Sequence, residues 1–392
     1  MTDELVPGRE LAALRALQSD KWRRFGPDVL PAHVAEMDYP VAAPIRAALA
    51  GRISRQDYGY PLPGGRDGGR LLAEAFAQRM ADRFDWSPDP ALVIPMGDLV
   101  QGLYACVLAF SDPGDGVIVL MPSYPKIREA VTANARRLLA LTLRDDGERF
   151  AFDPAELEAL ASDRARLLII CNPHNPTGRV FSRAELRALG ECAERHNLIV
   201  LVDEVHADLV YTGARHLSFA GLDPAFAVRS VTLNSATKSF NIPGLRCAVA
   251  AFGDRALLQR FSQRIPPRVL GDPNVFGLDA TLAAWQDGQP WLAAVLTELE
   301  AARDRVVTVL RAAAPAIRIR APEATYLAWL DCSGLELPVT ASDYFLRAAG
   351  VALSPGQAFI PGGSACVRLN FATSPTLLEH ILQRMLDALT RG

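Results

Sequence analysis

The chain has 392 residues, half of them hydrophobic, which is enough for a large core and, at roughly 100 to 200 residues per domain, for two or three domains. Its 41 basic and 44 acidic side chains leave a net charge of −3, which argues against nucleic-acid or anionic-membrane partners and favours a small molecule. The polar start is unlike a secretory leader, and no apolar run reaches about 18 residues, so we expect a cytoplasmic protein without a membrane span.

Short apolar runs alternate with helix-like segments in the first two thirds of the chain. The runs have the length of buried parallel strands and lie at residues 116–120, 167–170, 198–202, 228–233 and 248–252. Between the second and third runs, Ser182 and Glu185 have the spacing of a capping box at the start of a helix that extends to about His196. The alternation predicts an α/β domain with a mostly parallel sheet flanked by helices.

The pattern changes after Pro290, where longer helical and shorter strand-like segments follow one another. We expect a helix at 291–313, a strand at 325–330, a helix at 342–349 and a strand at 366–371. These segments predict a smaller α+β domain. We therefore divide the chain into an N-terminal segment (1–50) that packs on the small domain or a partner subunit, a large domain (51–288) and a small domain (289–392).

The residues that could bind metals or form covalent bonds are few. Six cysteines are scattered without a CxxC pair, which predicts reduced core thiols, and the six histidines lack metal-ligand spacing, so no metal is expected. Lysine occurs only at positions 21, 126 and 238. Chemistry that requires a primary amine therefore has three candidates.

Lys238 follows the strand predicted at 228–233, and open α/β sheets bind ligands at the carboxyl ends of their strands. An aldehyde cofactor needs an amine in such a place. The hydroxyls of Ser235 and Thr237 could hydrogen-bond a phosphate, and Arg246 could pair with it. Taken alone, an exposed surface lysine is the commoner explanation.

Two further polar residues also follow predicted strands. Asp203 ends the run 198–202, where a buried carboxylate is costly unless it meets a cation such as a protonated pyridine nitrogen; a helix cap is the alternative. Asn175 begins the second of two Asn-Pro pairs in the tight turn 172–178, from which it could donate to a phenolic oxygen; a plain turn is the alternative.

An aromatic ring and a helix start complete the set. Tyr124 follows the strand at 116–120 and could stack on a pyridine ring. Gly97 and Gly102 flank a helix start at which the backbone amides of Leu99 and Val100 offer a phosphate seat. An amine, a carboxylate, a stacking ring and a phosphate seat together predict pyridoxal 5'-phosphate (PLP), held by Lys238 as a Schiff base.

The order Asn175, Asp203, Lys238, Arg368 resembles the fold type I PLP enzymes, the aspartate aminotransferase superfamily, over almost the whole chain. The resemblance is greater still to the MalY/PatB branch of carbon–sulfur β-lyases. The segments that carry it are AEMDYP (35–40), YGY (58–60), DEVH (203–206), KSFNIP (238–243), TYLAWLD (325–331) and VRLN (367–370).

The resemblance implies roles for individual residues. Lys238 would carry PLP and later move a proton, with Asp203, Asn175 and Tyr124 in the catalytic site around the ring. Arg368 would bind the substrate α-carboxylate, helped by Asn175 and by Tyr60, which would also reach the phosphate across the interface of a homodimer.

Two positions affect the choice within the superfamily. His206, placed with the cofactor-binding residues, stands where many aminotransferases have tyrosine, which favours the lyase branch. Arg246 resembles the phosphate-binding arginine of aminotransferases, which some lyases of the branch lack.

The resemblance thus implies a PLP-dependent lyase that cleaves cystathionine or another cysteine S-conjugate by α,β-elimination to a thiol, pyruvate and ammonia. A class I/II aminotransferase is the first alternative, and a natural-product enzyme with oxidative or decarboxylating chemistry is the second. All three share the same site, because fold and cofactor do not decide the reaction. A PLP-binding regulator is disfavoured, because no DNA-binding helix pair or basic extension is visible.

Overall fold

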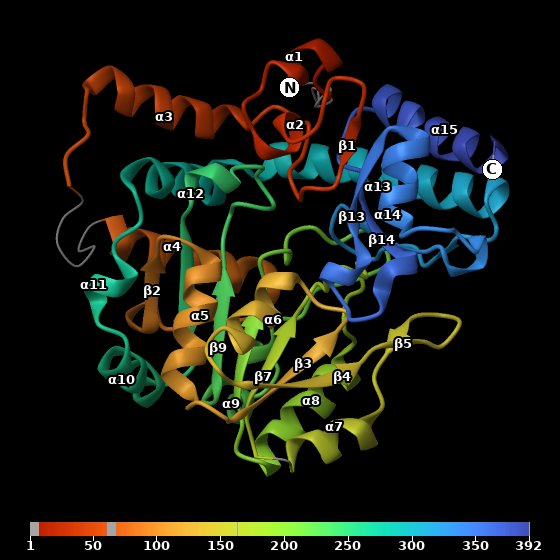
Figure 1. Cartoon of the computed structure of the whole chain (residues 1–392). Coiled ribbons are helices and arrows are strands. Elements are labelled where there is room, and N and C mark those ends of the chain that lie inside the picture. Colours follow the sequence, from red (N-terminus) through yellow and green to blue (C-terminus); the bar gives the residue numbers. More distant parts are fainter. Residues whose placement is uncertain (1–7, 61–67, 163, 392) are drawn as a thin grey trace.

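The computed structural model describes residues 8–60, 68–162 and 164–391. It contains a seven-stranded sheet, a five-stranded sheet and a two-stranded ribbon formed by β5 (Arg144–Asp145) and β6 (Phe150–Ala151). The larger sheet lies in the lower half of Figure 1, and the strands of the smaller one lie above it, toward the C-terminus. The mixed α/β class is as predicted.

The seven-stranded sheet has the strand order β2-β10-β9-β8-β7-β3-β4. Its strands are β2 (Val93–Met96), β3 (Gly116–Met121), β4 (Arg137–Thr142), β7 (Ala165–Cys171), β8 (Ile199–Asp203), β9 (Ser230–Asn234) and β10 (Ala248–Phe252). β10 runs antiparallel to both of its neighbours, β2 and β9, and the other neighbouring pairs are parallel. We predicted 248–252 as a further parallel strand, and that orientation is wrong. The link from β9 holds only turns and a short 3₁₀ helix, so no crossover helix carries the chain back.

Both faces of this sheet are buried. Along β3, Val117 and Val119 pack into the core on one face, whereas Ile118 and Leu120 pack into the core on the other. The first face is covered by α5 (Leu99–Phe110), α6 (Pro125–Thr132) and α10 (Arg255–Arg264), and the second by α7 (Pro154–Ala161), α8 (Arg183–Arg195) and α9 (Pro224–Ala227). The predicted capping box at the start of α8 is present.

The five-stranded sheet combines the two ends of the chain. Its order is β1 (Leu30–Ala32), β13 (Val351–Pro355), β14 (Cys366–Asn370), β12 (Leu327–Asp331) and β11 (Arg318–Ile319). The helices of this part are α13 (Gln289–Ala313), α14 (Ala341–Tyr344) and α15 (Pro375–Arg391). A π-helical turn (Phe345–Ala349) continues α14, so the helix predicted at 342–349 changes its winding midway. The parallel pairing of β1 with β13 ties the N-terminal segment to this sheet.

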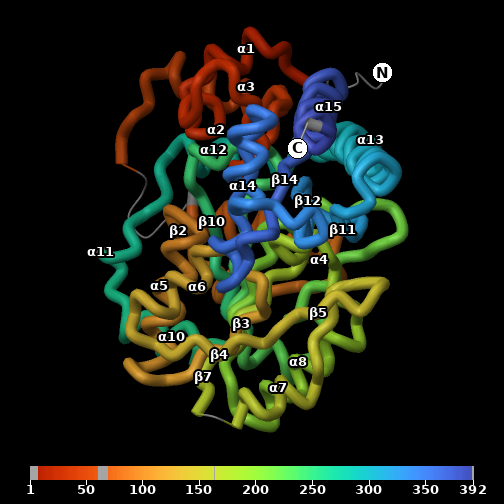
Figure 2. Tube along the Cα trace, turned by 45° about the vertical axis from the view of Figure 1, so that its right-hand side comes forward, coloured from red at the N-terminus to blue at the C-terminus, as the bar shows by residue number. Residues whose placement is uncertain are grey.

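The remaining α-helices lie before β2 or between β10 and α13. They are α1 (Leu11–Arg15), α2 (Asp20–Arg23), α3 (Ala43–Arg55), α4 (Gly68–Phe84), α11 (Pro267–Leu270) and α12 (Val275–Asp287). In Figure 2, α1 lies at the top, with α3 and α12 below it, and α3 packs against α12. Arg52 of α3 makes an ion pair with Asp279 of α12 at 2.5 Å. Of the helices in the described ranges, none is long and apolar enough to cross a membrane.

Candidate active site

A cavity of about 670 Å³ lies at the carboxyl ends of the central strands. Cys171 ends β7, Asp203 ends β8 and Ser235 directly follows β9, and all three line it. His33 from the N-terminal segment and Arg368 from β14 line it as well. The cavity is therefore at the edge where open α/β sheets bind their ligands, and it is completed by both ends of the chain.

Lys238 lines this cavity, as predicted from its position after a strand. Its Nζ donates a hydrogen bond of 3.0 Å to the carbonyl oxygen of Ala35. Loss of hydration and the nearby positive charge of Arg368 lower the pKa of the Lys238 amine to about 8. An amine with this pKa is partly unprotonated near neutral pH, as a nucleophile or base must be.

The two other lysines have different surroundings. Lys21 is buried in α2, where its Nζ makes an ion pair of 2.9 Å with Asp38. Lys126 is exposed on α6 and pairs with Glu129. Neither lines the cavity. The structure thus leaves Lys238 as the amine within reach of a ligand bound there.

Asp203 is 5% exposed at the end of β8. One of its oxygens accepts a hydrogen bond of 3.1 Å from the backbone N–H of Val205. Burial raises the pKa of this carboxyl group to about 6, against a smaller lowering by Lys238. A cation placed against the carboxylate would offset the cost of burying its negative charge. The protonated pyridine nitrogen that we predicted for this position is such a cation.

Arg368 is a buried guanidinium on β14, with no carboxylate in ion-pair contact within the described ranges. Its three hydrogen bonds go to the side chain of Asn175 at 3.0 Å, the carbonyl of His33 at 2.9 Å and the hydroxyl of Ser354 at 3.1 Å. Burial lowers the pKa of Arg368 to about 10. A buried cation whose partners are all neutral suits an anionic ligand such as an α-carboxylate.

Tyr124 and His206 also line the cavity. Tyr124 directly precedes α6 and is partly exposed. His206 is 2% exposed, and its Nδ1 has no hydrogen-bond partner in the described part of the chain. Burial lowers the pKa of His206 to about 3, so the imidazole is neutral at physiological pH. The structure thus brings both predicted rings to the cavity, while their contacts with the cofactor stay a prediction.

The predicted phosphate residues Ser235, Thr237 and Arg246 all line the cavity, next to the start of α5. The hydroxyl oxygens of Ser235 and Thr237 are 2.9 Å apart. Arg246 is mostly exposed and lies 3.5 Å from Asp98.

Asp98, which lies among these groups, had no role in our sequence prediction. Its carboxylate caps α5 by accepting from the amides of Val100 at 2.8 Å and Gln101 at 3.2 Å, whereas Leu99, the other predicted seat, has no such bond to it. An acidic residue directly before an apolar helical run is a recognisable N-cap signal that could have identified it. Any phosphate bound at this helix start must approach the Asp98 carboxylate.

Tyr60 does not line the cavity of the single chain. It is fully exposed and directly precedes residues 61–67, which lie outside the described part. Tyr58, also exposed, has its ring 6.0 Å from that of Phe276 at the start of α12. The contact of Tyr60 with a partner's cofactor therefore stays a prediction.

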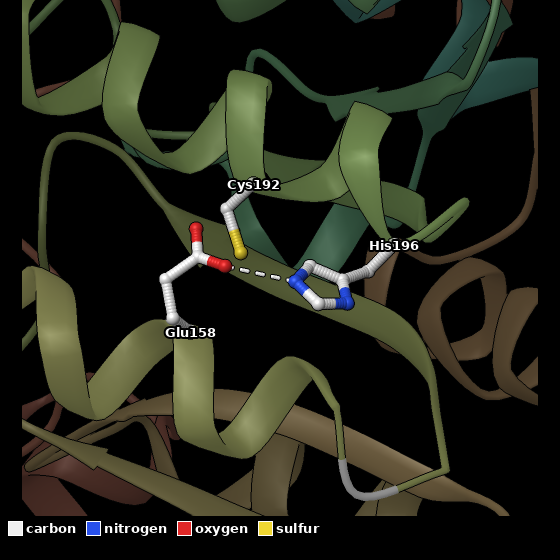
Figure 3. A group of neighbouring side chains, drawn as sticks. All are labelled: Glu158, Cys192 and His196. Atoms are coloured by element: carbon white, nitrogen blue, oxygen red, sulfur yellow. Dashed lines mark hydrogen bonds and ion pairs between the residues drawn. The ribbon is translucent and has the colours of Figure 1, made fainter.

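A second group of possible ligands lies away from the cavity. Figure 3 shows Glu158 of α7 facing Cys192 of α8 and His196 just beyond it, with ligand atoms within 4.8 Å of one another. Glu158 is already paired with Arg195 and hydrogen-bonded to His196 at 2.8 Å. Burial and the Glu158 carboxylate raise the pKa of the Cys192 thiol to about 12. These three side chains therefore interact with one another and with Arg195, and they hold α7 against α8.

The residues around the cavity fit the cofactor that the sequence predicts. Asp203 is a buried carboxylate without a hydrogen-bonded cation in the described structure, and Arg368 is a buried cation without a carboxylate. A protonated pyridine ring and an amino-acid carboxylate would supply the two missing charges. The amine of Lys238 stands in the same cavity.

The fold and this cavity define an enzyme of the aminotransferase class I and II family, to which the chain belongs, since residues 45–385 match that family. The chain is 34% identical to the cystathionine β-lyase PatB of Bacillus subtilis, over 95% of this chain and 97% of PatB. A solved structure assigned as a PLP-dependent β-cystathionase of Corynebacterium diphtheriae has a TM-score of 0.92 at 31% identity, covering 98% of this chain and 99% of that one. The structure of OvoB has a TM-score of 0.91 at 36% identity, covering 96% and 97%.

Proposed function

We propose that this chain is a PLP-dependent carbon–sulfur lyase that cleaves a cysteine S-conjugate, such as cystathionine, by α,β-elimination. The observation that carries the proposal is the meeting of an amine (Lys238), a carboxylate (Asp203) and a guanidinium without an acidic partner (Arg368) in one cavity. The names of PatB and of the β-cystathionase structure support elimination over the other reactions of the family.

Each residue has a separable task. Lys238 would hold PLP, Asp203 would face the pyridine nitrogen, and Arg368 would bind the α-carboxylate of the amino acid and keep it within reach of Lys238. When bound, PLP supplies an electron sink for the pair of electrons left at Cα. Because the pKa of the lysine is about 8, its free amine can accept the Cα proton near neutral pH.

Elimination then breaks the bond between Cβ and sulfur. The sulfur leaves with the bonding electrons and is released as a thiol after it gains a proton. Hydrolysis of the remaining three-carbon fragment gives pyruvate and ammonia, so one water is consumed for each conjugate cleaved.

The test mixes the purified protein and PLP with an S-substituted cysteine and measures thiol and pyruvate, with and without a 2-oxo acid. Thiol release without the oxo acid is the expected result. A reaction that strictly needs the oxo acid identifies an aminotransferase instead and refutes the lyase proposal. Oxygen uptake or release of carbon dioxide would point to the oxidative or decarboxylating alternative.

We also propose a cytoplasmic homodimer. The free cysteines at all six positions support a reducing compartment. The exposed side chains of Tyr58, Tyr60 and Val269 lie on the segment before residue 61 and on α11, and they support a protein interface on this side of the molecule.

A further inference from the structure

We infer that Asn370 is a positioning residue for Lys238: it orients the backbone carbonyl of Ala35, to which the lysine amine donates. The inference rests on the proposed function only in taking Lys238 as the reacting amine. Asn370 is 2% exposed at the end of β14, two residues after Arg368.

The side-chain amide of Asn370 grips the N-terminal segment on both sides of Ala35. Its Nδ2 donates to the carbonyl of Val34 at 2.6 Å and to the carbonyl of Glu36 at 2.7 Å, and its Oδ1 accepts from the N–H of Ala372 at 2.8 Å. Both amide hydrogens are therefore used by the same segment. The Asn370 side chain thereby connects residues 34–36 to the segment that directly follows β14.

The carbonyl of Ala35 lies between the two that Asn370 holds. It accepts hydrogen bonds from Lys238 Nζ at 3.0 Å and from the hydroxyl of Tyr326 at 2.9 Å. Because peptide groups are planar, fixing the peptide groups before and after it restricts the rotation of the one between. Asn370 thus sets the direction of an oxygen that it does not itself touch.

This oxygen acts on the proton affinity of the lysine. A carbonyl that accepts from an ammonium favours the protonated form, so losing its alignment should lower the pKa of Lys238. The other groups facing the amine are Arg368, which lowers the pKa, and Glu36, Asp203 and Asp98, which raise it; neutral His206 stands beside them. Asn370→Ala removes none of these charges.

Tyr326 provides the opposite perturbation. Its hydroxyl shares the Ala35 oxygen with the lysine. Tyr326→Phe keeps the ring and leaves the oxygen to Lys238 alone, so the pKa of the amine should rise. The two substitutions should therefore shift the pKa of Lys238 in opposite directions. If Asn370 and Tyr326 served only to stabilise the fold, no such opposite shifts would be expected.

The experiment measures the pKa of Lys238 by competitive acetylation of the full-length chain freed of cofactor. Acetic anhydride is added in trace amounts at a series of pH values, and the modified lysines are quantified by mass spectrometry. With three lysines in the chain, exposed Lys126 serves as the internal reference and Lys21 is shielded in its ion pair. We expect Asn370→Ala to lower the pKa of Lys238 by about one unit and Tyr326→Phe to raise it by about half a unit.

The control is Asn172→Ala. Asn172 is 1% exposed and its side chain also bridges separate segments, to the carbonyl of Leu217 and from the N–H of Phe181, but it has no contact with residues 34–36. It should leave the Lys238 labelling curve unchanged. Equal curves for the parent and Asn370→Ala, or shifts of the same sign in both test variants, overturn the inference.

Two features keep the result decisive. If Asn370→Ala does not fold, Asn370→Ser keeps one donor for one of the two carbonyls and should give about half the shift, while Tyr326→Phe tests the shared oxygen independently. The labelling needs no turnover, so a failed lyase assay and a failed positioning role are told apart. A lysine pKa that follows these changes supports the role of Asn370 whichever reaction the enzyme performs.

Discussion

Asp203 is a carboxylate that the fold buries at the end of β8 with a backbone N–H as its hydrogen-bond donor. Its pKa of about 6 in the folded chain exceeds the value of 3.8 for a solvated aspartate. The folded protein therefore binds more protons than the unfolded one between these values, and stability is lost as pH rises from about 4 to about 6. Above that window the burial of Asp203 costs about 3 kcal/mol.

Asp203→Asn should accordingly stabilise the cofactor-free protein at pH 8 by up to about 3 kcal/mol and have little effect at pH 4. The same change should remove most of the lyase activity, because an amide cannot stabilise a protonated pyridine nitrogen. Denaturant unfolding at the two pH values, together with the thiol assay, measures both effects. An Asn variant that is less stable than the parent at pH 8 contradicts this account.

Asp98 presents a different conflict of charge. Its carboxylate caps α5 at the place where the helix start and Arg246 would receive a phosphate. Asp98→Asn keeps an oxygen for the cap and removes the negative charge, so we expect PLP to bind several-fold more tightly, with helix stability changed by only a few tenths of a kcal/mol. Titration of the cofactor-free chain with PLP gives the Kd. Weaker binding in Asp98→Asn would mean that this carboxylate serves mainly to hold Arg246.

At the scale of elements, α2 holds the N-terminal segment through a buried ion pair. Asp38 accepts from Lys21 at 2.9 Å and from the indole N–H of Trp22 at 2.8 Å. Removing one member of a buried pair leaves an uncompensated charge, so Lys21→Met should lower the free energy of unfolding by about 3 to 5 kcal/mol. Lys126→Met, on an exposed pair, should change it by no more than about 0.5 kcal/mol.

The same variants separate structural lysines from the chemical one. Lys21→Met and Lys126→Met should retain the visible absorbance that PLP gives when joined to a lysine, whereas Lys238→Ala should lose it. Spectra of the three purified variants, reconstituted with PLP, provide the comparison. Absorbance that survives in Lys238→Ala would refute the assignment of the cofactor-binding amine.

At the scale of the whole molecule, the site depends on segments far apart in the chain. The five-stranded sheet joins residues 30–32 to the C-terminal strands, and through it His33 and Ala35 reach Arg368 and Lys238. We propose that the domain boundaries stay near residues 50 and 288, with the N-terminal segment contributing a strand to the small domain.

The proposed homodimer is a property of this scale too. We expect light scattering to give twice the mass of the 42.4 kDa chain. Tyr60→Phe should weaken PLP binding by about tenfold, through loss of a hydrogen bond to a charged phosphate of the partner's cofactor, while the dimer persists. Unchanged PLP affinity in a dimeric Tyr60→Phe protein would place Tyr60 outside the phosphate site.

Much of the site was accessible from the sequence because its residues follow strands. Asp203 ends its strand, Asn175 and Lys238 each follow theirs by four residues, and the carboxyl ends of parallel strands meet at one edge of a sheet. The capping box of α8 could also be predicted, because it depends on two residues only three positions apart. Arg368, by contrast, was identified only by resemblance, because nothing local distinguishes it from the chain's many other arginines.

The sequence by itself determined the α/β class, the candidate amine and the strand-end residues, since these depend on period, local spacing and the rarity of lysine. Tertiary structure alone decided that β10 runs antiparallel, that Asp98 faces Arg246 and that Asn370 holds the carbonyls around Ala35. Those contacts join residues up to 336 positions apart. Every residue has a backbone carbonyl, so the sequence does not indicate which carbonyl will accept a given hydrogen bond. A pattern of residues can place groups on the same edge of a sheet, but only packing decides which atoms meet.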